Sequence, residues 1–209
     1  MKKKNLEIIL QKIPDFDKPS PLLEQYTTPG NIAADILFIA FQYKDIKDKE
    51  ILDLGCGTGI FSVGAYLLGA KKVTGIDIDK TAVKIAKNYA LEKNYDINYI
   101  HKDVKDVETT ADTTIMNPPF GAQKQNKKGD RIFIEKGFQL SKIIYTIHLT
   151  ETIPFLEKMI KSLNGKITLA KNYNFPIKHT YDFHKKRVVN YDVTLLRIDT
   201  NKRLNTKIL

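Results

Sequence analysis

Residues 51–59 read ILDLGCGTG, a short apolar strand that runs directly into a glycine-rich turn. A helical spacing of apolar residues follows from Ile60 to Gly69. Glycines at alternate positions let the backbone turn sharply and approach a ligand, and the following helix presents free N–H groups. This strand–turn–helix unit predicts an open α/β sheet with a ligand site at the carboxyl end of the strand.

The glycine turn does not fit the dinucleotide fingerprint G-x-G-x-x-G. Counted from Gly55 the sixth position is Ile60, and counted from Gly57 it is Ser62, so the third glycine is missing. Asp53 stands just before the first glycine, where a carboxylate would repel a pyrophosphate but attract a cationic amino-acid group. The turn therefore favours S-adenosylmethionine, whose methionine portion carries an ammonium and a sulfonium.

Acidic residues also follow the next two predicted strands, 72–77 and 97–101. Asp77 ends the first of them and can accept hydrogen bonds from both hydroxyls of a ribose. Its other reading is a cap for the helix predicted from Lys80 to Lys93, a role that suits Asp79 better. Asp103 could accept a hydrogen bond from the adenine amine of the cofactor, although a charged loop residue is usually only solvated.

The tetrapeptide Asn117-Pro118-Pro119-Phe120 follows a buried strand predicted at 113–116. Two prolines cannot continue that strand, so the chain turns away at the carboxyl edge of the sheet. The Asn117 side-chain oxygen and the Pro118 carbonyl are acceptors, and Phe120 adds an aromatic face. This set suits a planar amine such as N6 of adenine. The alternative is a rigid turn with Phe120 packed in the core.

Strands and helices alternate along most of the chain, which predicts an α/β fold with a mostly parallel sheet covered on both faces. The last two strands lack a helix between them and should pair antiparallel. Strands are predicted near 50–54, 72–77, 97–101, 113–116, 143–148, 166–172 and 188–198, and helices near 5–13, 31–43, 59–69, 80–93, 131–140 and 151–162. We divide the chain into an amino-terminal helix with a cofactor-covering segment (1–30), one catalytic domain (31–200) and a tail (201–209).

Composition limits the class of protein further. A chain of 209 residues forms one substantial core. No stretch reaches the about 18 apolar residues of a membrane span, and no apolar signal core follows the lysine-rich start, so we expect a cytoplasmic protein without membrane contact. Cys56 is the single cysteine, which excludes an internal disulfide and a cysteine-based zinc site. We expect no metal.

The positive charge lies after the Asn-Pro-Pro-Phe motif. Residues 1–120 hold 16 Lys and Arg against 17 Asp and Glu, whereas residues 121–209 hold 18 against 7. Basic groups bind phosphates and aromatic faces stack on unpaired bases, so this half predicts RNA binding. The alternative is a basic surface that only keeps the protein soluble. The candidate RNA-binding residues are Lys124, Lys127, Lys128, Arg131, Tyr181, Phe183, His184, Lys185, Lys186 and Arg187.

The order of these motifs resembles class I S-adenosylmethionine-dependent methyltransferases that act on amines. More narrowly, Leu23 to Thr28, Met116 to Gly121 and Phe183 to Lys186 resemble the family that methylates adenine N6 in small-subunit ribosomal RNA. The family's eukaryotic members usually show proline where this chain has Thr27. The resemblance implies a Rossmann-like, seven-stranded, mostly parallel sheet with an antiparallel last strand.

The resemblance and the residue arguments together define the candidate site. Catalysis is expected from Asn117, Pro118, Pro119 and Phe120. S-adenosylmethionine is expected to contact Gln25, Tyr26, Thr28, Asp53, Gly55, Gly57, Thr58, Gly59, Ile60, Asp77, Ile78, Asp103, Val104 and Asn117. For Tyr26, core packing is an equal alternative. Relatives bind a small zinc-binding activator subunit; apolar residues around the first glycine-turn helix could serve it, although core packing suits most of them better.

Three other functions stay open. A glutamine methyltransferase acting on release factors also uses Asn-Pro-Pro before an aromatic residue, but usually ends the motif in tyrosine and carries an extra amino-terminal domain. A DNA adenine methyltransferase would usually need a target-recognition domain. A non-catalytic RNA-binding module predicts decayed cofactor motifs, and here they are intact.

Overall fold

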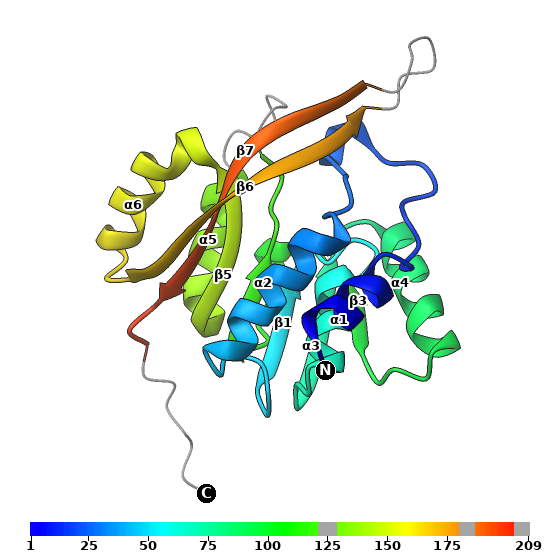
Figure 1. Cartoon of the computed structure of the whole chain (residues 1–209). Coiled ribbons are helices and arrows are strands. Elements are labelled where there is room, and N and C mark those ends of the chain that lie inside the picture. Colours follow the sequence, from blue (N-terminus) through cyan, green and yellow to red (C-terminus); the bar gives the residue numbers. More distant parts are fainter. Residues whose placement is uncertain (121–128, 180–186, 203–209) are drawn as a thin grey trace, which may run out of the picture.

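The computed structural model of the chain describes residues 1–120, 129–179 and 187–202. Its centre is a sheet of seven strands in the order β3-β2-β1-β4-β5-β7-β6 (Figure 1). Strands β1 to β5 pair in parallel, whereas β7 runs antiparallel to both neighbours, β5 and β6. The predicted Rossmann-like α/β class, with a mostly parallel sheet and an antiparallel last strand, is confirmed. The strands are β1 (Glu50–Leu54), β2 (Lys72–Asp77), β3 (Asn98–His101), β4 (Ala111–Met116), β5 (Ser141–Leu149), β6 (Lys166–His179) and β7 (Arg187–Asp199).

Helices cover both faces of the sheet (Figure 1). They are α1 (Lys3–Leu10), α2 (Gly30–Gln42), α3 (Ile60–Leu67), α4 (Lys80–Glu92), α5 (Gly129–Leu140) and α6 (Ile153–Ser162). Helix α1 ends at Leu10 and not at Ile13 as predicted, because the chain turns tightly there and the Ile13 N–H donates to the Leu10 carbonyl.

Neighbouring residues in each central strand face opposite helical layers. In β1, Ile51 packs with α1, α2 and α3, whereas Leu52 and Leu54 pack with α5 and α6. In β7, Leu195 joins the first of these clusters and Leu196 the second. Because these strands are buried on both sides, they read as continuous apolar runs, and all carboxyl ends of the parallel strands meet at one edge.

Strands β6 and β7 continue past the rest of the sheet. Strand β7 pairs with β5 only as far as Val193, yet β6 and β7 stay paired up to His179 and Arg187. They therefore form a two-stranded ribbon beyond the carboxyl end of β5, visible at the top of Figure 1. The predicted end of β6 near residue 172 is wrong, because the alternating apolar pattern carries on through Phe175, which is fully buried. Pro176 is tolerated because β6 is an edge strand.

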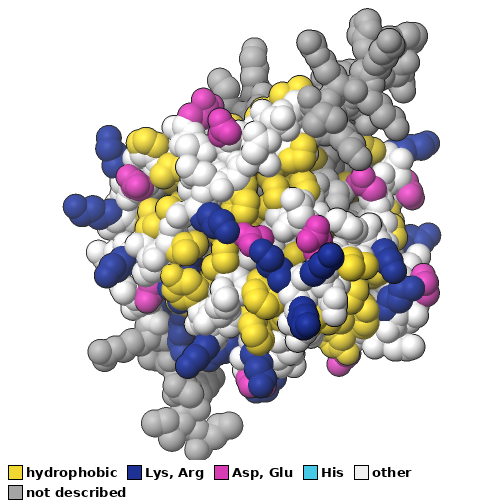
Figure 2. Space-filling model, viewed as in Figure 1, with side chains coloured by type: hydrophobic (Ala, Val, Ile, Leu, Met, Phe, Trp, Pro, Cys, Tyr) yellow, Lys and Arg dark blue, Asp and Glu magenta, His cyan; other side chains and the backbone are white. Residues whose placement is uncertain are grey.

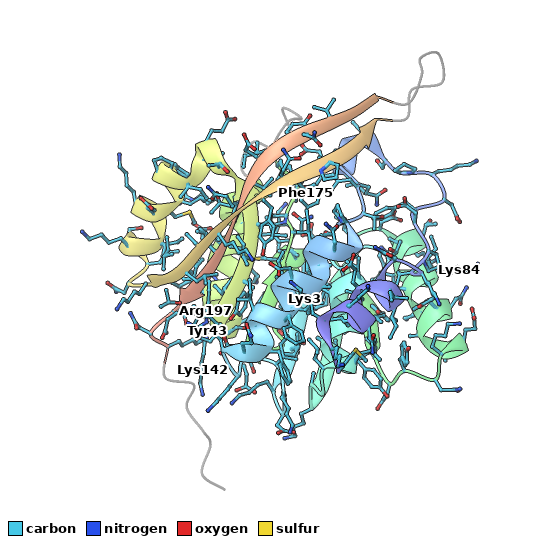
Figure 3. All side chains as sticks on the ribbon, in the orientation of Figure 1. Lys3, Tyr43, Lys84, Lys142, Phe175 and Arg197 are labelled. Carbon is cyan, nitrogen blue, oxygen red and sulfur yellow. The ribbon has the colours of Figure 1, made fainter. Side chains whose placement is uncertain are left out.

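The opposite end of β7 is held by a buried ion pair. The Arg197 guanidinium donates to the Asp45 carboxylate at 2.8 and 3.2 Å and lies over the Tyr43 ring, 4.7 Å from its centroid (Figure 3). The Tyr145 hydroxyl donates to the same carboxylate at 2.6 Å. A bidentate pair with an added hydrogen bond satisfies the charges that burial would otherwise leave uncompensated. This cluster joins the end of α2 to the last two strands.

Within the described residues, no helix is long and apolar enough to cross a membrane, and no group of three His, Cys, Asp or Glu side chains could hold a metal ion. Cys56 is buried in the glycine turn, and burial raises the pKa of its thiol. That protonated thiol suits a packing role rather than nucleophilic attack.

Candidate active site

A cleft opens at the carboxyl ends of β1, β2 and β4, where the parallel sheet places its ligand site. The segment between α1 and α2 covers it from one side and α5 borders it on the other. The cleft brings together most of the predicted cofactor residues, and these are Gln25, Tyr26, Thr28, Gly55, Gly57, Thr58, Ile60, Asp77, Ile78, Asp103, Val104 and Asn117. Pro119 also lines it, whereas Asp53, Gly59, Pro118 and Phe120 are not among its lining residues.

The glycine turn bends under the floor of the cleft. Gly55, Gly57 and Gly59 have φ of +71°, +53° and +94°, a region that L side chains rarely adopt. Aromatic rings cover the first two: a Cβ at Gly55 would lie 3.2 Å from the Phe133 ring, and one at Gly57 would lie 2.9 Å from Phe16. Glycine is therefore required there both for the turn and for the space above it.

Gly59 serves the turn from behind. A Cβ at Gly59 would collide with the hydroxyl of the buried Tyr99, and no part of Gly59 lines the cleft. Its role is packing at the start of α3 and not the predicted contact with the cofactor.

The Asp77 carboxylate at the tip of β2 holds the glycine turn in place. One oxygen accepts from the Gly57 N–H and the other from the Asp79 N–H, both at 2.8 Å. Burial raises the pKa of Asp77, an effect opposed by these two N–H donors. Each oxygen retains a further lone pair, so the carboxylate can also receive ribose hydroxyls. Asp79 caps α4 through the Thr81 N–H, as the sequence indicated.

Gln25 ties the covering segment to this acidic loop. Its amide N–H donates to the Asp79 carboxylate at 2.6 Å, while its oxygen accepts from the Ser20 backbone N–H at 2.8 Å. The amino-terminal segment is thus attached to the start of α4, beside the Asp77 carboxylate.

Asp53 faces away from the cleft, contrary to the predicted contact with the cofactor's cationic group. It is only 1 % exposed, and one carboxylate oxygen accepts both from the Ser62 N–H at 2.9 Å and from its hydroxyl at 2.6 Å. Burial, opposed by the Ser62 hydrogen bonds and aided by Asp77, raises the pKa of Asp53 to about 7. Asp53 therefore anchors α3 beneath the glycine turn, with a charge that burial makes costly.

Asn117 lies at the carboxyl end of β4 with its amide in a defined orientation. The amide nitrogen donates to the Thr28 hydroxyl at 3.1 Å. The amide oxygen is buried and has no hydrogen-bond partner among the described residues. Buried acceptors are rarely left unpaired. The oxygen is thus a vacant acceptor at the side of the cleft.

Phe120 is buried (8 % exposed) and packs in an aromatic cluster with Tyr26 and Phe175. The Tyr26 and Phe120 centroids are 5.1 Å apart, and Phe175 meets both rings edge-on from the base of the β6–β7 ribbon (Figure 3). The Tyr26 hydroxyl also approaches the Pro118 carbonyl, at 3.5 Å. The packing alternative holds for Phe120 in this structure, and Tyr26 combines packing with a place in the cleft.

The remaining predicted cofactor residues form the far wall. Ile78 is half exposed, and Val104 is buried beside it in the lining. The Asp103 carboxylate accepts from the Lys105 N–H at 2.9 Å, which caps a short turn and leaves a second oxygen available. An apolar surface beside a carboxylate oxygen is the chemistry that an adenine ring with its amine requires.

Most of the predicted RNA-binding residues lie outside the described residues: Lys124, Lys127, Lys128, Tyr181, Phe183, His184, Lys185 and Lys186. Arg131 is described and forms an exposed ion pair with Glu135 on α5, at 2.8 Å. Arg187 begins β7 opposite His179. The face seen in Figure 2 mixes Lys and Arg with Asp and Glu, so it is not a basic surface.

Sequence reasoning missed several residues of the cleft: Phe16, Leu23, Glu24, Thr27, Cys56, Phe61, Lys105, Ile132 and Phe133. For Phe16 a signal existed, because it is an isolated aromatic among charged residues in a loop. Phe133 belongs to the apolar face of α5, and its approach to Gly55 depends on tertiary packing.

Comparisons with known proteins agree with this geometry. A family model described as the methyltransferase small domain matches residues 31–142. An uncharacterized protein of Methanocaldococcus jannaschii is 40% identical over 95% of this chain and 94% of its own length. The rRNA N(6)-adenosine-methyltransferase of Danio rerio is 34% identical over 94% of this chain and 98% of its own length. The crystal structure of a candidate RNA methyltransferase from Pyrococcus horikoshii has a TM-score of 0.88 and 37% identity, covering 95% of this chain and 98% of that chain.

Proposed function

The chain belongs to the class I S-adenosylmethionine-dependent rRNA N6-adenosine methyltransferases, and from this premise we propose that it modifies an unpaired adenosine of small-subunit ribosomal RNA. The observation that carries the proposal is the vacant Asn117 amide oxygen beside the cleft. A target amine has two N–H groups to donate, and an uncharged acceptor can take one of them without protonating the nitrogen.

The cleft fits S-adenosylmethionine on this structure's own features. The positive φ angles of Gly55 and Gly57 open space over the turn, and the Asp77 carboxylate lies at the tip of the adjacent strand. Asp77 would hold the ribose hydroxyls, and Ile78, Val104 and the second Asp103 oxygen would hold the adenine ring. The bound cofactor supplies an electrophilic methyl group on a sulfonium, whose in-line transfer needs positioning rather than a metal.

The chain's residues would then prepare the target amine. Its lone pair is delocalised into the adenine ring, so the nitrogen is a poor nucleophile. Hydrogen bonds to the Asn117 oxygen and the Pro118 carbonyl would favour a pyramidal nitrogen and aim its lone pair into the cleft. Because Phe120 is buried with Tyr26 and Phe175, we propose that this cluster shapes the pocket wall, with Tyr26 the member that lines the cleft. The base must be unpaired or flipped out to reach this site.

We extend the proposal to a small zinc-binding activator subunit and to a cytoplasmic location. Helix α3 is a poor surface for a partner, since Ile60, Phe61 and Val63 are buried in the core. The open edges of the sheet at β3 and β6 are the better candidates, because an added strand would pair their free backbone groups. Co-purification of the expressed chain with such a subunit would test this part.

Labelled S-adenosylmethionine tests the substrate. The purified chain, with and without the activator, is incubated with small and large ribosomal subunits, release factor and duplex DNA. We expect label in small-subunit RNA, as N6-methyladenosine at one mapped nucleotide. Label in the release-factor glutamine would support the N5-glutamine alternative, and label only in large-subunit RNA or DNA would overturn the choice of target. Asn117→Ala should lose most turnover while keeping the affinity for the cofactor.

A further inference from the structure

Thr28 lies next to the proposed acceptor but serves it from outside the reaction. Its hydroxyl accepts the Asn117 amide N–H at 3.1 Å, and the Thr28 residue is 4 % exposed. The other end of the same amide, the buried oxygen, lacks a partner among the described residues. One side-chain amide thus has its donor end bound and its acceptor end vacant.

Both partners of this hydrogen bond are held by a following proline. Thr28 precedes Pro29, the residue before the start of α2, and Asn117 precedes Pro118. A residue before proline is restricted to extended backbone conformations, so neither side chain can drift by a backbone change. Helix α2 in turn is anchored by fully buried residues such as Ile36 and Leu37. The hydroxyl is therefore fixed relative to the end of β4.

We infer that Thr28 is a positioning residue for methyl transfer, whose hydroxyl holds the Asn117 amide with its oxygen toward the target amine. The inference rests on the proposed function of Asn117. When the amide oxygen receives the target amine, the amide N–H groups point the other way and need an acceptor in a buried place. The Thr28 hydroxyl is that acceptor. Without it, the productive orientation leaves a buried donor unpaired.

The hydrogen bond also matters to the rate itself. Donation from the amide nitrogen to Thr28 polarises the amide and makes its oxygen a stronger acceptor. As the methyl group moves onto the target nitrogen, that nitrogen gains positive charge and its N–H groups become stronger donors. The hydrogen bond to Asn117 therefore strengthens in the transition state, and its loss should lower kcat rather than only the affinity for RNA.

Three variants test the inference. Thr28→Val keeps the shape and removes the hydroxyl, Thr28→Ser keeps the hydroxyl, and Thr113→Val is the matched control. Thr113 lies on β4 and its buried hydroxyl donates to the Asp45 carbonyl at 2.8 Å, away from the cleft. Measured quantities are kcat and KM on the RNA substrate, the cofactor Kd by calorimetry, and the melting temperature.

We expect Thr28→Val to lower kcat about tenfold with the cofactor Kd unchanged, because an unpaired buried donor costs about 1–3 kcal/mol. Thr28→Ser should stay near wild type, and Thr113→Val should lose stability but keep kcat. A wild-type kcat in Thr28→Val, or a weaker cofactor Kd with kcat intact, overturns the inference. So does an equal loss in Thr28→Ser. If Thr28→Val does not fold, Thr28→Ala replaces it in the same comparison. A wild-type enzyme inactive on adenosine refutes the proposed function, whereas an active one insensitive to Thr28→Val refutes only this role.

Discussion

Replacing Gly57 by alanine should weaken both the fold and the binding of the cofactor. Gly57 has φ of +53°, and a left-handed backbone costs an L-residue about 1–2 kcal/mol. The new Cβ would lie 2.9 Å from Cζ of Phe16. An ordinary carbon–carbon contact is about 3.5 Å or longer, so the Phe16 ring must move by about 0.6 Å or more.

Gly69→Ala separates the backbone cost from the collision. Gly69 has φ of +87°, and the nearest atom to its Cβ is Lys47 Cγ at 3.6 Å, which is ordinary contact. We expect about 1–2 kcal/mol from strain at Gly69 and about 2–3 kcal/mol at Gly57, since Phe16 sits on a loop and yields more easily than a core ring. For a chain of this length that corresponds to melting temperatures lower by about 3–6 °C and about 6–9 °C.

Thermal unfolding by circular dichroism and cofactor titration by calorimetry measure the two effects. Displacement of Phe16 should weaken cofactor binding about fivefold in Gly57→Ala, equivalent to about 1 kcal/mol, while Gly69→Ala keeps wild-type affinity. Adding Phe16→Ala to Gly57→Ala should remove the excess thermal loss over Gly69→Ala. Equal melting temperatures in the two single variants, together with wild-type cofactor affinity in both, would refute the placement of Phe16 over the turn.

Three further outcomes are expected. Asp77→Ala should weaken cofactor binding by roughly 1–3 kcal/mol in a folded protein, because the carboxylate supports the Gly57 N–H and can receive the ribose; unchanged affinity by calorimetry would remove Asp77 from the site. Since the pKa of Asp53 is about 7 in the fold against 3.8 ordinarily, its carboxyl is protonated in the fold and ionised in the unfolded chain between these values. Stability relative to Asp53→Asn should therefore fall as pH rises through that window, by up to about 4 kcal/mol, and urea unfolding at about pH 4 and about pH 8 would contradict this if the difference stayed constant. Neutralising Lys185, Lys186 and Arg187 together should weaken RNA binding and reduce the logarithmic salt slope by about 0.7 to 0.9 for each phosphate that is no longer neutralised, whereas an unchanged slope would assign these residues to solubility.

Local signals predicted most of the fold, and tertiary contacts account for the errors. The glycine turn, the Asp79 cap and the Asn-Pro-Pro break each depend on residues close in the chain, and each lies where expected. The direction of Asp53 was missed although its position contains the answer. Side chains alternate along a strand, so Asp53 shares the face of Ile51 and points toward α3, not toward the cleft.

The ring above the turn required information that no local pattern holds. Phe16 reaches Gly57 across a segment of irregular structure, and the vacant Asn117 oxygen depends on Thr28, which lies far away in the chain. Phe120 was expected to face the base, but Phe175 of the extended β6 strand encloses it. That strand was predicted too short, so the partner that buries Phe120 could not be foreseen.

The place of β7 between β5 and β6 sets an order on the birth of the protein. Strand β6 leaves the ribosome before β7, yet β7 is its hydrogen-bonded neighbour in the sheet. Until β7 arrives, β5 and β6 both present free edges, the condition under which nascent strands pair with the wrong chain. Exposed Lys166 and Lys171 on β6 oppose such pairing by charge. A chain that stops before Arg187 would keep the glycine turn and Asn117, but it would lack β7 and the Asp45–Arg197 pair and would aggregate through those edges.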